Sequence, residues 1–204
     1  MKKKIACLLL AAGKSSRMQG TNKLLLDIGG QSLILRSANE ALKANFCEVA
    51  VVTGFQSDLI QDEIESLPLT VVFNPHFSSG MHSSIRKGLE YLSCSYDAFV
   101  VCLADQPNFN YRTVLQLIER YERSDERTII YPTFNGERGN PVLIPASYVS
   151  EIFAEPDGDH GCLYLLKRHW QNVTAVEVGN KSVLLDIDSP EDYFSSIVET
   201  QHAN

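Results

Sequence analysis

The chain has 204 residues, of which 44% are hydrophobic and 21% charged, which suits a single domain with a sizeable buried core over residues 1–204. Its formal net charge of −7 at pH 7 repels nucleic-acid backbones and argues against a DNA or RNA partner. No run of about 18 apolar residues occurs, so the sequence predicts no membrane-spanning helix.

The cysteines are scattered, odd in number and without CxxC spacing; they are Cys7, Cys47, Cys94, Cys102 and Cys162. This pattern argues against a disulfide framework and against a zinc site, and it fits a reducing cytoplasm. Three lysines followed by the apolar run 5–12 resemble a short signal peptide, but the run leads into Gly13-Lys14-Ser15, which is no small-residue cleavage site. We therefore expect a first buried strand and a cytoplasmic protein.

Apolar, β-rich segments alternate with segments of helical periodicity along the chain. We predict strands at 4–10, 48–53, 70–73, 98–103 and 128–131, and helices at 33–43, 57–65, 83–92 and 111–123. Several strand segments are continuously apolar, as expected for strands covered on both faces. The alternation implies βαβ units and therefore a Rossmann-like, doubly wound, mostly parallel α/β sheet.

The last third of the chain has a less regular pattern. Short strands are expected at 141–144, 173–178 and 183–187, and a short helix at 162–169. A final helix is expected to begin at Ser189-Pro190-Glu191-Asp192, which places a Ser cap before a proline and two acids in the first turn.

Ligands of open α/β sheets bind beyond the carboxyl ends of the strands, so the residues that follow each strand are the candidates for function. After the first strand come four small or apolar residues and two cations; these are Leu10, Ala11, Ala12, Gly13, Arg17 and Lys23. Small residues let the backbone approach a ligand, and the two cations could neutralise phosphate charge. The segment is neither a Walker loop nor a GxGxxG fingerprint, and a flexible, solvated basic turn is the alternative.

Two further junctions carry candidate residues. Gly80 and Ser84 lie where a helix N-terminus would present free amide groups to a ligand, although a plain helix cap is the alternative. We expect no function for the neighbouring His82. Asp105 ends the predicted strand 98–103; a carboxylate there is costly unless it is paired or binds a cation, and Mg²⁺ prefers such oxygens. A helix cap is its alternative role.

Three segments together resemble the signature of the MobA-like NTP transferases, which include the molybdenum cofactor guanylyl- and cytidylyltransferases. They are Leu10-Ala11-Ala12-Gly13, Ser15-Ser16-Arg17-Met18 and Asn22-Lys23-Leu24-Leu25. The resemblance implies a nucleotide-diphospho-sugar transferase-like fold in which this loop wraps the NTP phosphates and Arg17 and Lys23 contact them. Most members carry Gly directly after Arg-Met, where this chain has Gln19.

Other segments extend the resemblance to residue 192. Gly80-Met81-His82-Ser83-Ser84 resembles the family segment that holds the base and ribose, and Leu103-Ala104-Asp105-Gln106-Pro107 resembles its metal-binding segment. Asn140 and Asp159, in Gly139-Asn140-Pro141 and Gly158-Asp159-His160-Gly161, would lie on the acceptor side by the same resemblance. A strand-entry turn and a plain turn acid are their alternatives.

A second metal ligand is expected from the segment 185–192. On a strand, Asp186 and Asp188 would point to one side by period two. Related enzymes use an Asp or Asn here, and we assign Asp186, leaving Asp188 to support the Ser189 cap or to replace Asp186 as the ligand.

The resemblance implies a Mg²⁺-dependent nucleotidyltransferase with Arg17, Lys23 and Asp105 as catalytic residues. The cytidylyltransferase branch fits best: CMP would pass from CTP to the phosphate of a molybdopterin-type cofactor, with release of pyrophosphate. A molybdenum hydroxylase or its chaperone would then receive the product. The alternatives are transfer from GTP, another phosphorylated acceptor, or a non-catalytic cofactor carrier; a carrier has no need of the predicted metal site.

Overall fold

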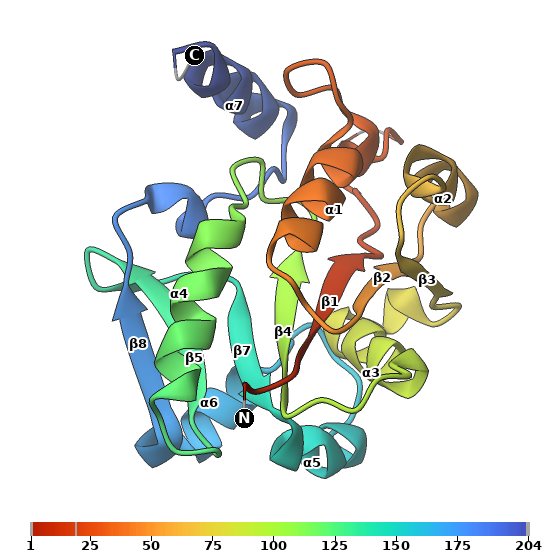
Figure 1. The fold of residues 1–204 in the computed structure, drawn as a ribbon. Helices are drawn as coiled ribbons and strands as arrows, with labels where there is room; N and C mark the ends of the chain where they lie inside the picture. The colour runs from red at the N-terminus through yellow and green to blue at the C-terminus, as the bar shows by residue number, and fades with distance from the viewer. Residues whose placement is uncertain (1, 19, 203–204) are drawn as a thin grey trace.

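The computed structural model describes residues 2–18 and 20–202, and it places their strands in one sheet (Figure 1). The order across the sheet is β3-β2-β1-β4-β7-β5-β6, with β8 paired to β5. In chain order the strands are β1 (Ile5–Ala11), β2 (Val49–Thr53), β3 (Thr70–Phe73), β4 (Ala98–Leu103), β5 (Ile129–Phe134), β6 (Glu137–Arg138), β7 (Val142–Pro145) and β8 (Val173–Glu177).

The sheet is mostly parallel, as the sequence predicts. Strands β3, β2, β1 and β4 run parallel to their neighbours, and β8 runs parallel to β5. Strand β7 is antiparallel to both β4 and β5. The predicted α/β class is therefore confirmed, with one antiparallel strand in the middle of the sheet.

Helices cover both faces of the sheet (Figure 1). They are α1 (Leu33–Lys43), α2 (Ser57–Ile64), α3 (Met81–Tyr91), α4 (Tyr111–Glu122), α5 (Val149–Ala154), α6 (Leu163–Arg168) and α7 (Pro190–His202). Apolar residues of α1, α2 and α4 pack on one face, and those of α3, α5 and α6 on the other. Because both faces are covered, all of β1 is buried, which explains its uninterrupted apolar sequence. No helix in the described part of the chain is long and apolar enough to cross a membrane.

The strand expected at 183–187 is wrong. Residues Lys181–Leu184 form a 3₁₀ turn instead, and no strand follows before α7. The apolar run is buried against single loop residues: the carbonyl of Val183 accepts a hydrogen bond from the Asn140 amide at 2.9 Å, and the Ile187 amide donates to the Asp105 carbonyl at 2.9 Å. These isolated bonds take the place of a strand ladder.

The predicted start of the last helix is confirmed. The Asp192 carboxylate accepts hydrogen bonds from the Ser189 amide at 2.8 Å and from the Asp188 amide at 3.0 Å. The Asp192 amide in turn donates to the Ser189 hydroxyl at 3.3 Å, so the pair forms a capping box. This box fixes the backbone of Asp188 at the entry to α7.

Candidate active site

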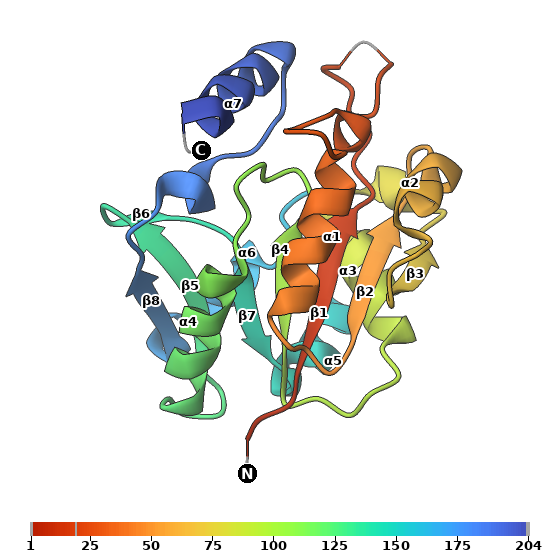
Figure 2. The ribbon, with the colours of Figure 1, turned by 45° about the horizontal axis from the view of Figure 1, so that its top comes forward.

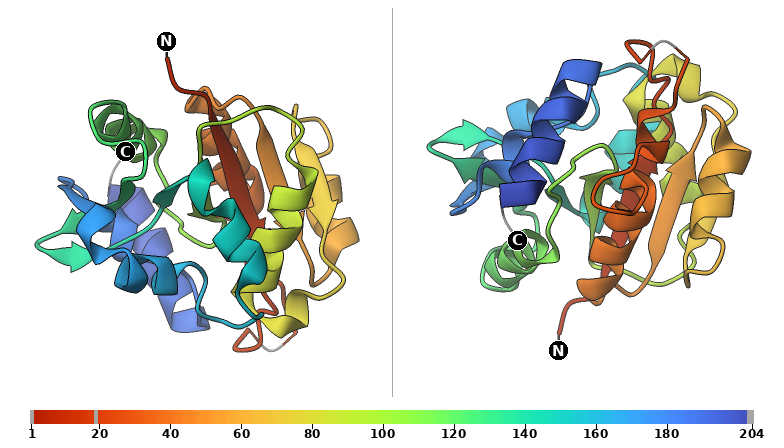
Figure 3. Two further views of the ribbon diagram at one scale, coloured as in Figure 1. Left: turned by 90° about the horizontal axis from the view of Figure 1, so that it is seen from below. Right: turned by 90° about the horizontal axis from the view of Figure 1, so that it is seen from above.

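A pocket of about 450 Å³ opens beyond the carboxyl ends of β1 and β4, the edge at which open α/β sheets bind ligands. In Figure 2 the loop after β1 and the segment leading into α7 lie above this edge of the sheet; the view from above in Figure 3 shows both segments over it. The pocket is lined by Leu10, Ala12, Gly13, Lys14, Ser15, Ser16, Arg17, Lys23, Phe77, Ser78, Ser79, Gly80, Met81, Ser84, Leu103, Asp105, Asp159 and Asp188.

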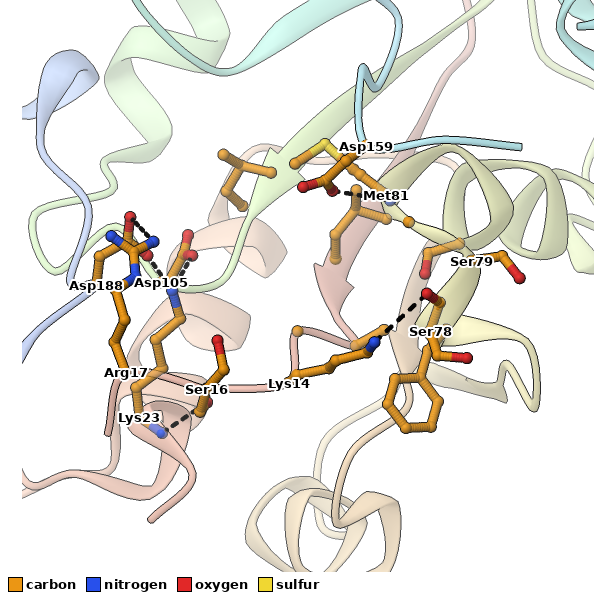
Figure 4. Close-up of a pocket in the computed structure, with 18 residues that line it drawn as sticks. Lys14, Ser16, Arg17, Lys23, Ser78, Ser79, Met81, Asp105, Asp159 and Asp188 are labelled. Carbon is orange, nitrogen blue, oxygen red and sulfur yellow. Dashed lines mark hydrogen bonds and ion pairs between the residues drawn. The ribbon is translucent and has the colours of Figure 1, made fainter. Parts of the chain in front are cut away.

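Lys23 is the centre of the charged cluster in this pocket (Figure 4). Its ammonium lies 2.6 Å from Asp105 Oδ2 and 2.9 Å from Asp188 Oδ1, while Arg17 pairs with the other oxygen of Asp188 at 2.7 Å. Burial acts to lower the pKa of Lys23, but the two carboxylates outweigh it and raise that pKa overall. Burial likewise acts to raise the pKa of Asp188, but its bonds with Lys23 and Arg17 lower it overall. The predicted cations and Asp105 are thus in one ion-pair network.

Local structure fixes the backbone that carries Lys23. Asn22 caps the short 3₁₀ turn Lys23–Leu25 by accepting from the Leu24 amide at 3.1 Å, and its amide group donates to the Phe55 carbonyl at 3.0 Å. The Lys23 amide donates to the Ser15 hydroxyl at 3.1 Å. The two ends of the loop after β1 are thereby tied together, so its cations face one pocket.

Asp105 has an oxygen that suits a hard cation. It follows β4, and its Oδ1 is buried without a hydrogen-bond partner among the described residues. A buried carboxylate oxygen without a partner is costly, whereas a divalent cation would satisfy it. The residues present therefore fit a metal. Within the described residues no group of three or more His, Cys, Asp or Glu side chains could hold an ion, so remaining ligands would come from substrate phosphates and water.

The two candidates for the second metal ligand lie in different surroundings. Asp188 lines the pocket, whereas Asp186 is exposed and is not among its lining residues. Although the residue is exposed, its carboxyl group loses part of its hydration to the surrounding chain; this desolvation and the nearby carboxylates of Asp188 and Asp105 raise the pKa of Asp186. When ionised, Asp186 therefore adds negative charge near the site. The period-two argument that placed both on one side fails because the segment is not a strand, and Asp192 rather than Asp188 supports the Ser189 cap.

The opposite wall of the pocket joins α3 to the loop that carries Asp159. Gly80 has a φ of 106° and packs so closely that a Cβ would lie 2.4 Å from the carbonyl carbon of Gly158. The Met81 amide donates to Asp159 Oδ1 at 3.3 Å. Ser84 is buried and accepts a hydrogen bond from the Asn74 side chain at 3.0 Å. Gly80, Ser84 and Asp159 therefore line the same pocket.

His82, for which we expected no function, holds this wall together. Its ring is fully buried, with Nδ1 3.1 Å from the Gly161 carbonyl and Nε2 3.0 Å from the Ile152 carbonyl. Its backbone amide also donates to the Gly158 carbonyl at 3.0 Å. The histidine therefore connects α3 to both ends of the loop. Its burial could not be predicted from the sequence, because the segment around it is otherwise polar.

Other candidate residues lie elsewhere or were missed. Asn140 is not among the lining residues; it lies with Gln106 and Val183 at a separate, shallow depression. Ala11 packs into the core on the α1 side rather than into the pocket. Lys14, which we did not single out, lines the pocket and donates to the Ser78 carbonyl across it at 3.5 Å (Figure 4). Its place in the same loop as Arg17 was the available signal.

The fold and this pocket define an α/β protein with a cluster of cations and carboxylates at the carboxyl edge of its sheet. The chain belongs to the family described as the MobA-like NTP transferase domain, whose model matches residues 7–173. It is 26% identical to "Molybdenum cofactor cytidylyltransferase" of Escherichia coli strain K12, covering 94% of this chain and 95% of that protein. It is also 26% identical to "Nicotine blue oxidoreductase" of Paenarthrobacter nicotinovorans, covering 91% and 93%.

Solved structures share the fold. A nucleotidyl transferase from Methanothermobacter superposes with a TM-score of 0.85 at 21% identity, covering 98% of this chain and 99% of that one. A Mycobacterium tuberculosis H37Rv protein in complex with manganese superposes with a TM-score of 0.80 at 22% identity, covering 96% and 98%. The predicted family and fold are therefore confirmed.

Proposed function

We propose that this protein transfers CMP from CTP to the phosphate of a molybdopterin-type cofactor and releases pyrophosphate. The observation that carries the proposal is the network of Arg17, Lys23, Asp105 and Asp188 in a pocket with one unpartnered Asp105 oxygen. Such a site combines cations for phosphates with a carboxylate for a metal. The cytidylyltransferase of E. coli, similar over nearly its whole length, supports the choice of nucleotide and acceptor.

The proposed reaction is an in-line displacement at the α-phosphorus of CTP. The acceptor phosphate is already ionised near neutral pH, so no general base is needed, and catalysis rests on positioning two anions and offsetting their repulsion. Arg17 and Lys23 stabilise charge on the leaving pyrophosphate. Asp105, with Asp188 or Asp186, would hold Mg²⁺, which neutralises phosphate charge when bound.

Substrate binding in this proposal requires an exchange of partners. In the protein alone, both cations are already paired with carboxylates. The triphosphate must compete with Asp188 for Arg17 and Lys23. Asp105 and Asp188 would hold a divalent cation in place of the Lys23 ammonium, which would leave Lys23 available to the phosphates. Nucleotide and metal are therefore expected to bind cooperatively.

Gly80 and Ser84 are proposed to contact the base or ribose, and Asp159 the acceptor, because all three line the wall opposite the cations. Asn140 lies outside that lining and would reach the acceptor only through a larger ligand. The product would pass to a molybdenum hydroxylase or its chaperone in the cytoplasm.

The test is pyrophosphate release by purified protein with Mg²⁺, a molybdopterin-type cofactor and each of the four NTPs in turn. Release with CTP alone, lost in Asp105→Asn, supports the proposal. The matched control is Asp62→Asn, because Asp62 is exposed on α2, outside the pocket. Release with GTP would identify GTP as the nucleotide substrate instead, and release only with another phosphorylated compound would identify that compound as the acceptor.

A second assay separates transferase from other activities. Absence of release from folded protein that binds the cofactor tightly would favour a cofactor carrier. Oxidation or reduction of nicotine blue would instead favour the activity for which the Paenarthrobacter relative is named.

A further inference from the structure

One cation that lines the pocket stands outside the charge network. Lys14 is exposed on the loop after β1, and its ammonium donates to the Ser78 carbonyl across the pocket at 3.5 Å. Figure 4 shows its side chain extending toward Ser78 and away from Arg17 and Lys23. No ion pair between described residues includes Lys14. Its charge is therefore not neutralised by a carboxylate of the described chain.

The other two cations of the pocket are held differently. Arg17 pairs with Asp188 at 2.7 Å. Lys23 pairs with Asp105 at 2.6 Å and with Asp188 at 2.9 Å. An anion that enters the pocket must displace these carboxylates before it contacts either cation. At Lys14 it displaces only an uncharged carbonyl, from a hydrogen bond whose length is near the upper limit for such bonds.

The backbone on either side of Lys14 also suits an anion. Residues 13–17 all line the pocket, and none of their backbone amides donates a hydrogen bond to another described residue. Ser15 has a φ of 50°, and turns with such a left-handed residue can point successive amides to one side, where they bind anions. The Lys14 ammonium therefore lies on a loop with several amide donors available to a ligand.

We propose that Lys14 is the residue that first binds the phosphate chain of the nucleoside triphosphate, before Arg17 and Lys23 exchange their partners. The inference rests on the proposed nucleotide substrate and adds to it a phosphate-binding residue and an order of events. The unneutralised ammonium attracts the strongly anionic triphosphate and raises its association rate. Because Lys14 and Arg17 belong to one short loop, phosphates held by Lys14 are then placed to compete with Asp188.

Contact with the base is the competing role for Lys14. Its partner Ser78 lies beside Gly80, on the wall for which a contact with the base or ribose is proposed. A hydrogen bond between two ionised groups is stronger than one between an ammonium and a neutral base, which favours the phosphates. The two roles also differ in their consequences: a phosphate contact acts equally on all NTPs, whereas a base contact distinguishes among them.

The experiment measures, by calorimetry, the binding of inorganic tripolyphosphate and of each of the four NTPs in EDTA, where no divalent cation can loosen the carboxylate pairs. Lys14→Met should weaken the binding of every one of these ligands on the order of tenfold at low ionic strength, and by less at high ionic strength, because an exposed charge is screened by salt. Lys14→Arg keeps the charge and should retain binding. The matched control is Lys167→Met, since Lys167 is exposed on α6 and outside the pocket.

The order of events is tested by stopped-flow mixing with a fluorescent CTP analogue. Lys14→Met should lower the association rate constant and weaken its dependence on salt, because long-range attraction acts on the encounter. The dissociation rate constant should change less. Lys167→Met should leave both rate constants as they are in the unmodified protein.

Four results would overturn the proposal. They are failure of the unmodified protein to bind tripolyphosphate, equal tripolyphosphate affinity in Lys14→Met, a loss that Lys14→Arg does not restore, and a loss confined to particular NTPs. The third would show that Lys14 only shapes the pocket wall, and the fourth that it contacts the base. None of these measurements depends on CMP transfer. A protein that binds triphosphates through Lys14 but releases no pyrophosphate would refute the proposed function and leave this inference intact.

Discussion

Replacing Lys23 with methionine tests the electrostatic design of the pocket directly. Methionine keeps a similar length and removes the charge that lies between Asp105 and Asp188. Two carboxylates would then face each other with Asp186 nearby and only Arg17 to offset them. We expect a less stable protein with a stronger attraction for divalent cations.

The magnitude follows from the exposure of the groups involved. The Lys23 side chain is 10% exposed, Asp105 22% and Asp188 32%. Breaking a fully buried pair costs about 3–5 kcal/mol, and losing an exposed pair about 0.2–1 kcal/mol. An intermediate loss of roughly 2 kcal/mol would lower the thermal midpoint of a chain of this length by roughly 4–8 °C.

The assay is thermal unfolding with and without Mg²⁺ or Mn²⁺, together with pyrophosphate release. The ammonium competes with a divalent cation for the same carboxylates, so Lys23→Met should bind the cation more tightly and gain more stability from it. A tenfold gain in affinity at saturating cation adds about 1.4 kcal/mol, or roughly 3–6 °C. Turnover should nevertheless fall on the order of 10²–10³-fold, because the proposed contact of Lys23 with the phosphates is lost.

Lys43→Met is the matched control, since Lys43 is 54% exposed on α1, pairs with Glu40 and lies outside the pocket. It should change neither the cation response nor turnover. The reasoning fails if Lys23→Met is as stable as this control, or if its cation-induced shift is no larger than that of the unmodified protein.

Further substitutions test the surroundings of the cluster. Asp186→Asn should stabilise the protein at neutral pH, because the pKa of Asp186 is raised above 3.8 on folding and its ionisation therefore opposes folding. In thermal scans this gain in stability should vanish as the pH falls below 3.8. A gain that is constant with pH, or no gain at all, would contradict the assigned charges. Gly80→Ala should lower both stability and turnover, because a Cβ would collide with Gly158 at a φ that side chains avoid; unchanged thermal unfolding would show that this wall can shift. His82→Phe should keep the buried volume but leave two carbonyls without their partner. Amide hydrogen exchange in residues 158–161 should then rise, and the KM for the acceptor should rise more than the KM for the NTP. An equal rise in both KM values would deny His82 a positioning role.

The central strands of the sheet could be predicted from the sequence because they are buried on both faces. The segments predicted at 4–10, 48–53, 70–73 and 98–103 fall on β1, β2, β3 and β4 within one residue at each end. In a doubly wound sheet, continuous apolar runs of this length are typical of central strands that are covered on both faces. Strand direction is different: nothing local marks β7 as antiparallel, since that depends on which neighbours it finds.

The same limitation explains the error at 183–187. Val183, Leu184 and Leu185 satisfy the apolar pattern of a strand, but a strand also needs a free edge. Strand β5 is already paired with β8, β7 and β6. The apolar run therefore packs on Gly139, whose missing Cβ makes room for Val183. An apolar pattern in the sequence does not show which segments compete for the same strand edge.

The site was predicted as a set of residues but not as a network. The loop after β1, Gly80, Ser84 and Asp105 could be placed because each follows a strand or lies at the start of a helix. Asp159, between α5 and α6, was placed only through the resemblance to the MobA-like family. That Lys23 bridges Asp105 and Asp188 could not be inferred, since it depends on contacts between residues up to 165 positions apart. The choice between Asp186 and Asp188 rested on a strand that does not form.

The wide separation of Lys23 and Asp188 has a consequence for synthesis of the chain. Chains emerge and fold from the N-terminus, so β1, β2, β3, β4 and the loop with Lys23 exist long before the segment 185–192. During that interval Lys23 can pair with Asp105 but not yet with Asp188, and Arg17 also lacks Asp188 as its partner. The capping box at Ser189 and Asp192 then brings Asp188 to the cations. The charge network of the nascent domain is thus incomplete, and it closes only after the segment that leads into α7 has been translated.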